Sequence, residues 1–569
     1  MESGSISVDG EAQLCGTTKT KHGGWITFPF IIATLAGLTL AGGGWLSNLI
    51  VYLIDQFHIN SIDAAQINNV VSGCTSLFPI VGAIVADSFL GSFAVIWISS
   101  IISLLGLLLF LLMATVDGMR PQNCQNDSSL CATTPSKTQY AMLYLTLTLV
   151  CIGLGGSRFT LATMGANQFT KAKHQETHFN WYFFTLYFAT VIASTAIVYV
   201  EDNVSWAWGF GICIMANVLG SIIFLLGKKY YYYDTPQGSP FTSLAQVIVA
   251  SFRKKKMALS SQSPDYYYGD DLQKKIDELP TNSFRLLNKA AVKIEGDILP
   301  NGSIAKPWNI CTVQQVEDLK TLFRILPLWS SSILLSTPIG IQGSLSVLQA
   351  LAMDRQLGPH FKFPAGSLLV FTLVTTAICL SLFDRFLWPT WKKIFGRNST
   401  PLQRVGIGHV FNMASMVVSA LVETKRRATA HSHHIQGSDM VALSVLWLVP
   451  QLVIVGIGEA FHFPGQVALY YQEFPSSLKS LATAMIALVI GIAYYLSTAV
   501  VDLFRRVTTW LPDDINNGNL DYLYWVVAVL GVINFGYYLA CACLYEYKNI
   551  DKAETDEMND CTETLTVKN

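Results

Sequence analysis

Apolar residues recur along this chain in long runs that short polar segments separate. Twelve of the runs are close to the length that an α-helix needs to cross the hydrocarbon core of a bilayer, about 20 residues. We therefore predict an all-α membrane protein. The predicted helices span approximately residues 29–54, 67–88, 93–115, 140–164, 181–200, 206–227, 322–352, 366–383, 405–422, 440–463, 477–503 and 522–544.

The spacing of the runs divides the chain into two similar halves. Six predicted helices occupy residues 29–227 and six occupy 322–544, with a linker at 228–321 and polar tails at 1–28 and 545–569. Inside the linker, apolar residues recur at helical spacing before a basic cluster; they are Leu244, Val247, Ile248 and Phe252. This pattern is typical of an amphipathic helix, which lies either on the anionic inner leaflet or against the helix bundle.

The composition supports a membrane protein. Charged residues make up 13% of the 569 residues, hydrophobic residues make up 51%, and the mean hydropathy is +0.40. Soluble domains carry about 25% charged residues. The formal net charge of −1 gives no bulk attraction to nucleic acid, so we expect the lipid bilayer and not nucleic acid as a partner. The first 22 residues are polar, and we expect no cleavable signal peptide.

The distribution of Lys and Arg predicts the orientation. The linker and the loop after the eighth predicted helix are both rich in Lys and Arg, and basic loops stay in the cytoplasm. With an even number of helices, both termini then lie in the cytoplasm. One basic cluster falls on the opposite side and breaks the rule locally; it consists of Lys425, Arg426 and Arg427.

The connection at 116–138 is external in this orientation. It contains Cys124, Cys131 and the glycosylation sequon that begins at Asn126. An oxidising exterior permits a disulfide between the two cysteines, and two free thiols are the alternative. We expect Asn126 to be a possible glycosylation site.

One cation lies inside the fourth predicted helix. Arg158 follows Gly153, Gly155 and Gly156, and Gly165 comes two turns later. An ionisable side chain in a hydrophobic helix is costly and usually functional, and small residues allow close approach to the backbone. We interpret Arg158 as the cation of a central anion site; the alternative is a structural ion-pair partner.

The tenth predicted helix supplies a second charge, Glu459. An ion pair between Arg158 and Glu459 would explain how both charges survive in a membrane, and an anion would then compete with Glu459 for Arg158. His462 lies three residues later, on the same side of the helix. It is a candidate substrate-binding or proton-carrying residue, or simply a packed polar residue.

Several longer motifs occur in a fixed order along the chain. GAIVADSFLGSF ends the second predicted helix, and it is followed by GANQF, FNWYFF, EDNVSWAWGFGI and EFPSSLKSLATA, at residues 82–93, 165–169, 179–184, 201–212 and 473–484. Together these motifs resemble the plant nitrate/peptide transporter family, in the proton-dependent oligopeptide branch of the major facilitators. The first motif resembles the signature loop in which an Asp supports gating, which here is Asp87; a plain helix end is the alternative.

The resemblance implies the twelve-helix major facilitator fold, with a substrate cavity between two halves that opens alternately to each side. Many members of the family carry a Lys where this chain has Arg158, and a Glu where it has Glu459. Guanidinium is planar and permanently charged, which suits a trigonal oxyanion such as nitrate. Chloride would also be attracted, with less geometric discrimination.

The chain departs from the family pattern in the first helix. Many members carry Glu-x-x-Glu-Arg there, linked to proton coupling, and the corresponding positions here are Leu35, Leu38 and Thr39. Without a carboxylate at these positions, protonation cannot drive the cycle from this helix. The combination resembles the nitrate-excretion subgroup.

We therefore expect a transporter of nitrate, with chloride as a second candidate anion, that works as a passive low-affinity efflux system. Two alternatives stay open. One is a proton-coupled symporter of peptide, glucosinolate or hormone with Glu459 as the titrating group; the other is a non-transporting anion sensor or regulatory subunit.

We expect no enzyme activity and no cofactor. The sequence GLGGSR is only a partial glycine pattern with no preceding strand. The histidines in HSHH suggest a solvated external loop more than a metal site; they are His431, His433 and His434. The resemblance implies the plasma membrane, with a vacuolar membrane as the alternative.

Overall fold

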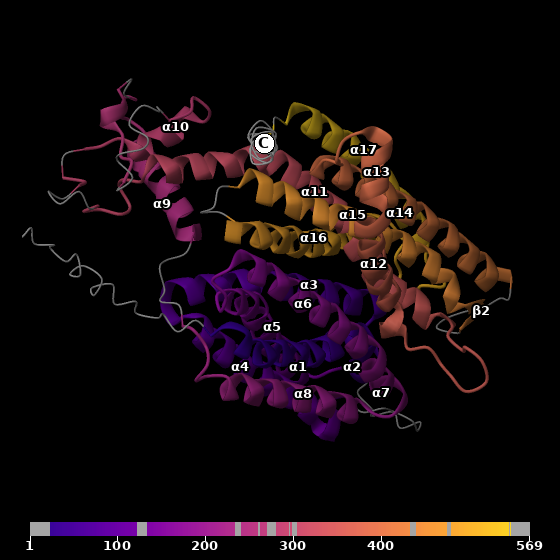
Figure 1. Cartoon of the computed structure of the whole chain (residues 1–569). Helices are drawn as coiled ribbons and strands as arrows, with labels where there is room; N and C mark the ends of the chain where they lie inside the picture. The colour runs from indigo at the N-terminus through magenta and orange to yellow at the C-terminus, as the bar shows by residue number, and fades with distance from the viewer. Residues whose placement is uncertain are drawn as a thin grey trace, which may run out of the picture.

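The structure is a computed structural model that describes residues 23–121, 134–233, 240–259, 262–269, 280–294, 296–298, 304–432, 440–474, 479–545 and 547. Within these residues, twelve helices are long and apolar enough to cross a membrane. Figure 1 shows that the helices of each sequence half lie together, so the molecule has two bundles side by side. The predicted all-α fold is confirmed.

The amino-terminal bundle is built from α1 to α8. These helices are α1 (Phe28–Ser47), α2 (Leu49–Phe57), α3 (Ser61–Val85), α4 (Ser92–Thr115), α5 (Lys137–Ala166), α6 (Ala172–Ile192), α7 (Val198–Asn203) and α8 (Trp206–Leu226). Short 3-10 turns lie at η1 (Gly24–Ile26) and η3 (Asp117–Met119), and π-helical turns lie at η2 (Ala86–Leu90) and η4 (Ala193–Ile197). The first predicted helix is interrupted at Asn48, whose side chain donates hydrogen bonds to Glu201 and Asp202.

Three consecutive glycines allow α1 to pack tightly. A Cβ atom on Gly42 would lie 2.6 Å from Leu154 on α5, and one on Gly44 would lie 2.5 Å from the Cys213 sulfur on α8. A Cβ atom on Gly43 would lie 2.8 Å from Ala193 in η4. Because all three separations are shorter than a van der Waals contact, larger residues here would push α1 away from its neighbours.

The carboxy-terminal bundle is built from α11 to α17. These helices are α11 (Val313–Leu351), α12 (Val370–Leu382), α13 (Trp388–Phe395), α14 (Pro401–Ser432), α15 (Val449–Glu473), α16 (Lys479–Val507) and α17 (Leu520–Leu544). The turns η7 (Ala365–Leu369), η8 (Phe383–Leu387) and η9 (Val445–Leu448) extend α12 and α15. Two short parallel strands, β1 (Met353–Asp354) and β2 (Val441–Ser444), pair at one end. The tenth predicted helix therefore starts later than expected, because residues 441–444 form β2.

The linker folds into a small module on the amino-terminal end of α11. It contains α9 (Pro240–Arg253), η5 (Ser263–Asp265), α10 (Arg285–Asn288) and η6 (Lys289–Ala291). Val247 and Ala250 on α9 are fully buried in the module core, so the predicted amphipathic helix exists and packs by this face. Ile248 and Phe252 are exposed, and contact of that face with lipid stays a prediction.

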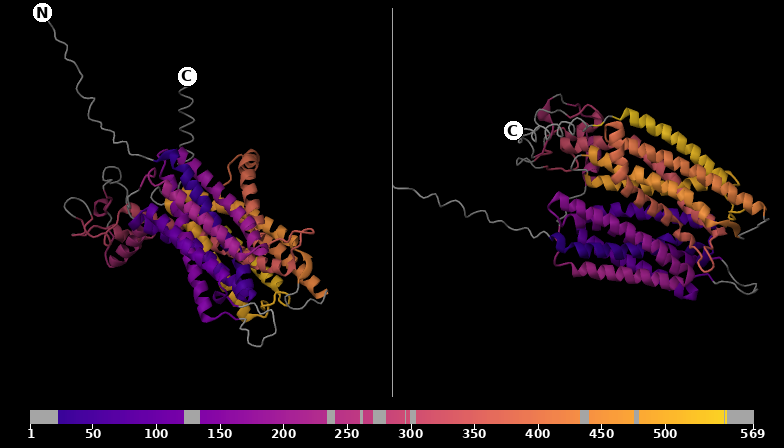
Figure 2. Two further views of the ribbon diagram at one scale, coloured as in Figure 1. Left: turned by 90° about the horizontal axis from the view of Figure 1, so that it is seen from below. Right: turned by 45° about the vertical axis from the view of Figure 1, so that its right-hand side comes forward.

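The end of the molecule that carries this module is called the tail end below, since α1 begins and α17 ends there (Figure 2). At the opposite end, direct contacts join the two halves. Arg505 on α16 forms an ion pair with Asp63 on α3, and the rings of Tyr199 and Phe361 stack with centroids 5.8 Å apart. These contacts close the opposite end of the space between the bundles.

The basic cluster that breaks the charge rule has partners at this opposite end. Arg426 is fully buried and forms a bidentate ion pair with Glu423, one turn earlier on α14. Arg427 pairs with Asp521, and the Lys425 ammonium lies 3.4 Å from the ring centre of Trp447. Each of the three basic residues that break the charge rule therefore has a partner side chain within the protein.

Candidate functional site

Arg158 faces away from the helices that support α5. A Cβ atom on Gly153 would lie 2.5 Å from Ser103 on α4, and one on Gly155 would lie 2.4 Å from Phe78 on α3. The glycines therefore form the face by which α5 packs into its own bundle. Arg158 is exposed, while its backbone carbonyl accepts a hydrogen bond of 2.6 Å from the Tyr182 hydroxyl on α6.

A cavity of about 110 Å³ lies beside Arg158. Helices α1, α5 and α6 form its walls, and most of the lining side chains are apolar. The hydroxyls of Ser157 and Thr190 line it as well, but each donates a hydrogen bond to a carbonyl of its own helix. Arg158 is the single lining residue with a formal charge, so the cavity is a weakly polar space with one fixed positive charge.

The first-helix positions that depart from the family pattern line this same cavity. Leu35, Leu38 and Thr39 all contribute to its wall, opposite the α5 residues. No carboxylate from α1 therefore reaches Arg158. Since uncharged side chains replace a potential counter-ion, the positive charge of Arg158 stays available to an anion.

Glu459 lies across the central space from Arg158, on α15. Gly456 brings α15 close to α12, because a Cβ atom there would lie 2.8 Å from the carbonyl oxygen of Thr372. The Thr376 hydroxyl then lies 3.4 Å from a Glu459 carboxylate oxygen and 3.0 Å from the carbonyl oxygen of Gly456. Glu459 is thus half-buried, with a hydroxyl neighbour from α12.

Two tyrosines connect the two charges. Tyr187 on α6 and Tyr494 on α16 each lie within electrostatic range of both Arg158 and Glu459. The four side chains therefore face one common space between the bundles. Among the described residues, Arg158 and Glu459 do not come within the 4.0 Å of an ion pair, so the pairing that we considered is absent from this conformation. Sequence reasoning missed both tyrosines, because Tyr is frequent in membrane helices.

His462 does not share the orientation of Glu459. Its side chain is 1% exposed and packs against α14, where a Cβ atom on Gly408 would lie 2.5 Å from it. Its Nδ1 lies 3.0 Å from the Gly458 carbonyl oxygen, and His409 is a neighbour. The expectation of a common face was wrong because α14 and α12 contact different sides of α15, and His462 has the position of a packed polar residue.

The other predicted site residues lie elsewhere or outside the described residues. Asp87 is exposed on η2 at the tail end, and η2 ends directly before Gly91, whose φ of 77° permits the turn into α4. Cys124, Cys131 and Asn126 are outside the part of the chain that the structure describes. Among the described residues, no group of three His, Cys, Asp or Glu side chains has the arrangement of a metal site.

Comparisons with a family model and with individual plant proteins point to the same family. A family model described as "PTR2: POT family" matches residues 93–517. Protein NRT1/ PTR FAMILY 2.7 from Arabidopsis thaliana is 54% identical over 549 residues, which is 96% of this chain and 97% of that protein. Protein NRT1/ PTR FAMILY 2.6 from the same plant is 52% identical, covering 98% and 99%.

Solved structures show the same fold. The crystal structure of an auto-inhibited POT family peptide transporter matches with a TM-score of 0.69 at 16% identity, covering 92% of this chain and 97% of that one. The POT family transporter PepTSo matches with a TM-score of 0.67, also at 16% identity, covering 91% and 97%. The similarity therefore extends over both bundles.

Proposed function

The chain belongs to the POT family of membrane transporters, in its plant NRT1/PTR branch, and from this premise we propose that it moves nitrate, and also chloride, through the cavity beside Arg158. The observation that carries the proposal is the composition of that cavity: one permanent cation faces a wall from which α1 contributes no carboxylate. A guanidinium donor fork matches the planar geometry of nitrate.

The direction that we propose is passive efflux, as in the nitrate-excretion subgroup that the motifs resemble. With a negative cytosol, an anion that leaves the cell gains about 2.3 kcal/mol per charge for each 100 mV. Export therefore needs no proton. Leu35 and Leu38 support this mode, because neither can exchange a proton during the cycle.

A second candidate is proton-coupled symport of a peptide or another organic solute. The position of Glu459 favours it, because this carboxyl faces the same space as Arg158 with one hydroxyl neighbour. In that mechanism Glu459 would carry the proton that the first helix no longer carries. A third outcome, anion binding without flux, would correspond to a sensor.

Membrane placement is part of the proposal. We propose that the tail end lies in the cytoplasm, that the membrane is the plasma membrane, and that Asp87 supports gating at the tail end. The loop with Asn126, Cys124 and Cys131 would then face the exterior. Accessibility of a tag on either terminus in intact cells measures this orientation directly.

The decisive experiment measures nitrate and chloride flux in proteoliposomes, with the membrane potential and the pH gradient imposed separately. We expect flux that follows the voltage and ignores the pH gradient. Arg158→Ala should reduce nitrate flux at least tenfold, a loss of about 1.4 kcal/mol or more in anion stabilisation. Arg158→Lys keeps the charge and should retain chloride flux better than nitrate flux.

A matched control is Arg506→Ala, because Arg506 is exposed at the opposite end and, among the described residues, its ion-pair partner is Asp502 one turn away. Flux should be unchanged in this variant. Unchanged nitrate flux in Arg158→Ala would sink the proposal, and flux that requires the proton gradient would favour the second candidate. Saturable binding without flux would identify a sensor.

A further inference from the structure

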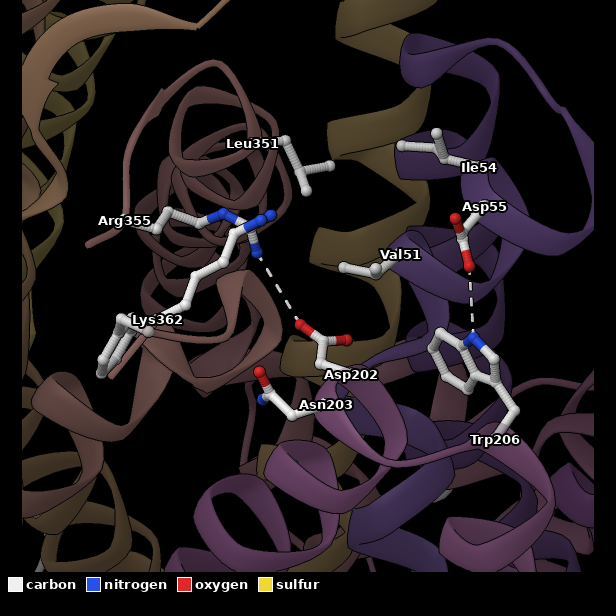
Figure 3. A pocket seen from close by; sticks show the side chains of 10 residues that line it. Val51, Ile54, Asp55, Asp202, Asn203, Trp206, Leu351, Arg355 and Lys362 are labelled. Atoms are coloured by element: carbon white, nitrogen blue, oxygen red, sulfur yellow. Dashed lines mark hydrogen bonds and ion pairs between the residues drawn. The ribbon is translucent and has the colours of Figure 1, made fainter. Parts of the chain in front are cut away.

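A second cavity, of about 230 Å³, lies at the opposite end between the two bundles (Figure 3). The amino-terminal half contributes Asp55, Asp202 and Trp206, and the segment after α11 contributes Arg355 and Lys362. In the close-up, Arg355 extends from one wall toward the carboxylate of Asp202 on the other, and the Lys362 side chain lies beside Arg355 on the same wall. The cavity is thus lined by carboxylates of the amino-terminal half and by cations of the carboxy-terminal half.

The two carboxylates of this cavity have donors of their own. Asp202 accepts a hydrogen bond of 3.0 Å from the Asn48 amide, and Asp55 accepts one of 3.2 Å from the Trp206 indole. Asp55 also accepts a bond of 2.7 Å from the Gln56 side chain. Part of their hydrogen-bonding capacity is therefore satisfied without the cations.

The cations are less completely satisfied. A terminal nitrogen of Arg355 lies 3.7 Å from an Asp202 oxygen, which is an ion pair but too long for a hydrogen bond. The Nε atom of Arg355 is buried without a hydrogen-bond partner. Among the described residues, Lys362 has no ion-pair partner within 4.0 Å, although its charge acts on Asp202. Both cations line the cavity, and cations whose hydrogen bonding is incomplete are the elements of an anion site.

We propose that this cavity is a second binding site for a small inorganic anion, held between Arg355 and Lys362 and in competition with Asp202. The volume is sufficient for a monovalent ion such as nitrate or chloride, and the two cations come from the carboxy-terminal half while the two carboxylates, Asp55 and Asp202, come from the amino-terminal half. The site is separate from Arg158, so it does not depend on the identity of the transported solute.

Occupation of this site has a consequence for the closed end. Asp202 belongs to one half and Arg355 to the other, so their ion pair helps to hold the halves together. An anion that takes over Arg355 weakens that contact while Arg505 and Asp63 still pair. Anions on this side of the membrane should therefore favour separation of the two halves at the opposite end.

The test uses the full-length protein carrying Arg158→Ala, which removes the central cation. Its thermal unfolding midpoint is followed against nitrate and chloride concentration, with gluconate added to keep the ionic strength constant. We expect a saturable rise in the midpoint, because a ligand of the native state stabilises it. Adding Lys362→Gln should weaken the apparent Kd about tenfold while the Arg355–Asp202 pair persists.

Lys137→Gln in the same background is the control, because Lys137 is exposed at the same end, at the start of α5. It should leave the apparent Kd unchanged. A midpoint that does not respond to either anion, or that responds equally with Lys362→Gln, overturns the proposal. Failure of nitrate flux through Arg158 leaves this readout intact, so the two proposals fail separately.

A second measurement addresses the separation of the halves. Spin labels at Val204 and His360, which are exposed beside the cavity on opposite halves, report the distance across it. We expect external nitrate to increase the population with a long distance, and Asp202→Asn to increase it without anion. A distance distribution that is insensitive to nitrate and to Asp202→Asn contradicts the competition with Asp202.

Discussion

Three consecutive cations on α14 should differ strongly in their contribution to stability. The substitutions are Lys425→Met, Arg426→Met and Arg427→Met, made one at a time. Met keeps a long apolar side chain and removes the charge. The three side chains have different surroundings: Lys425 contacts an aromatic ring, Arg426 is fully buried with a bidentate carboxylate, and Arg427 is itself partly exposed and pairs with a buried carboxylate. Because the three residues are consecutive on one helix, differences in the loss of stability reflect the surroundings of each side chain.

Arg426→Met should be the most destabilising substitution. Arg426 and Glu423 are both 0% exposed, and two guanidinium nitrogens lie 2.8 Å from the two carboxylate oxygens. Arg426 also donates to Asn516 and to the Ile515 carbonyl. Removal leaves Glu423 buried with the Gln349 amide as its remaining donor. Breaking a buried pair in this way costs about 3–5 kcal/mol.

The neighbouring substitutions should cost less. Lys425 is exposed and its contact with Trp447 is a cation–π interaction, which contributes about 0.5–1 kcal/mol at such sites. Arg427 donates to Asp521 at 2.5 Å and to Asn519, with side-chain exposures of 19% and 6% for the ion pair. A charged hydrogen bond of this kind contributes about 1.5–3 kcal/mol. The expected order of loss is therefore Arg426, Arg427, Lys425.

The assay is unfolding of the purified protein by heat and by SDS titration, with each variant compared at matched detergent concentration. The double variant Glu423→Gln/Arg426→Met should recover most of the stability lost by Arg426→Met, because the uncompensated carboxylate is gone. Equal losses at all three positions would refute the reasoning. A double variant less stable than Arg426→Met would show that the Glu423 carboxylate stabilises the fold through an interaction other than its pair with Arg426.

The remaining predictions concern the central cavity and the linker module. Leu38→Glu places a carboxylate in the wall beside Arg158, so apparent nitrate affinity in the flux assay should fall at least tenfold and become pH-dependent. Glu459→Gln removes a negative charge that faces the same space, so apparent nitrate affinity should rise several-fold. Burial raises the pKa of the Cys311 thiol to about 11, so its native alkylation rate should rise about tenfold per pH unit between pH 8 and 10. Lys254→Met leaves its buried carboxylate partner without a cation, so alkylation of Cys311 at pH 8 should accelerate at least tenfold through local unfolding.

Controls follow from the same structure. Leu38→Gln adds polarity to the cavity without charge and should change nitrate affinity much less than Leu38→Glu. Lys256→Met is the control for the linker, because Lys256 is exposed two residues after the buried Lys254, and it should leave Cys311 alkylation unchanged. A pH-independent alkylation rate, or an equal effect of both Lys variants, would argue against the assigned burial of the module core.

The membrane helices were predictable because an apolar run of sufficient length has few other stable states in a bilayer. The same pattern says little about breaks inside a run. The interruption at Asn48 depends on carboxyl partners about 150 residues later in the chain, which no local signal reveals. The start of α11 at Val313 follows from a capping box at Thr312, a local motif that periodicity alone overlooked.

The central site was partly predictable from the sequence. A charged residue inside an apolar run is conspicuous in the sequence, so Arg158 and Glu459 could be predicted. The direction in which each side chain points depends on how the helices pack, which the sequence does not show. His462 shows the limit: three residues separate it from Glu459, yet α14 covers one residue and α12 lies beside the other. The second anion site lies beyond sequence reasoning, because Arg355 and Lys362 come from a connection whose shape depends on the tertiary fold.

Helix α11 has a consequence for how the two ends of the molecule communicate. Its 39 residues start in the linker module and end four residues before Arg355, a continuous length of about 58 Å at 1.5 Å per residue. Pro327 and Pro338 are its two points of bending. A displacement of the linker module at the tail end is thus transmitted along one helix toward the ion pair between Arg355 and Asp202 at the opposite end. A regulator that binds the linker module and tilts it would act on the closure at the opposite end without entering the central cavity.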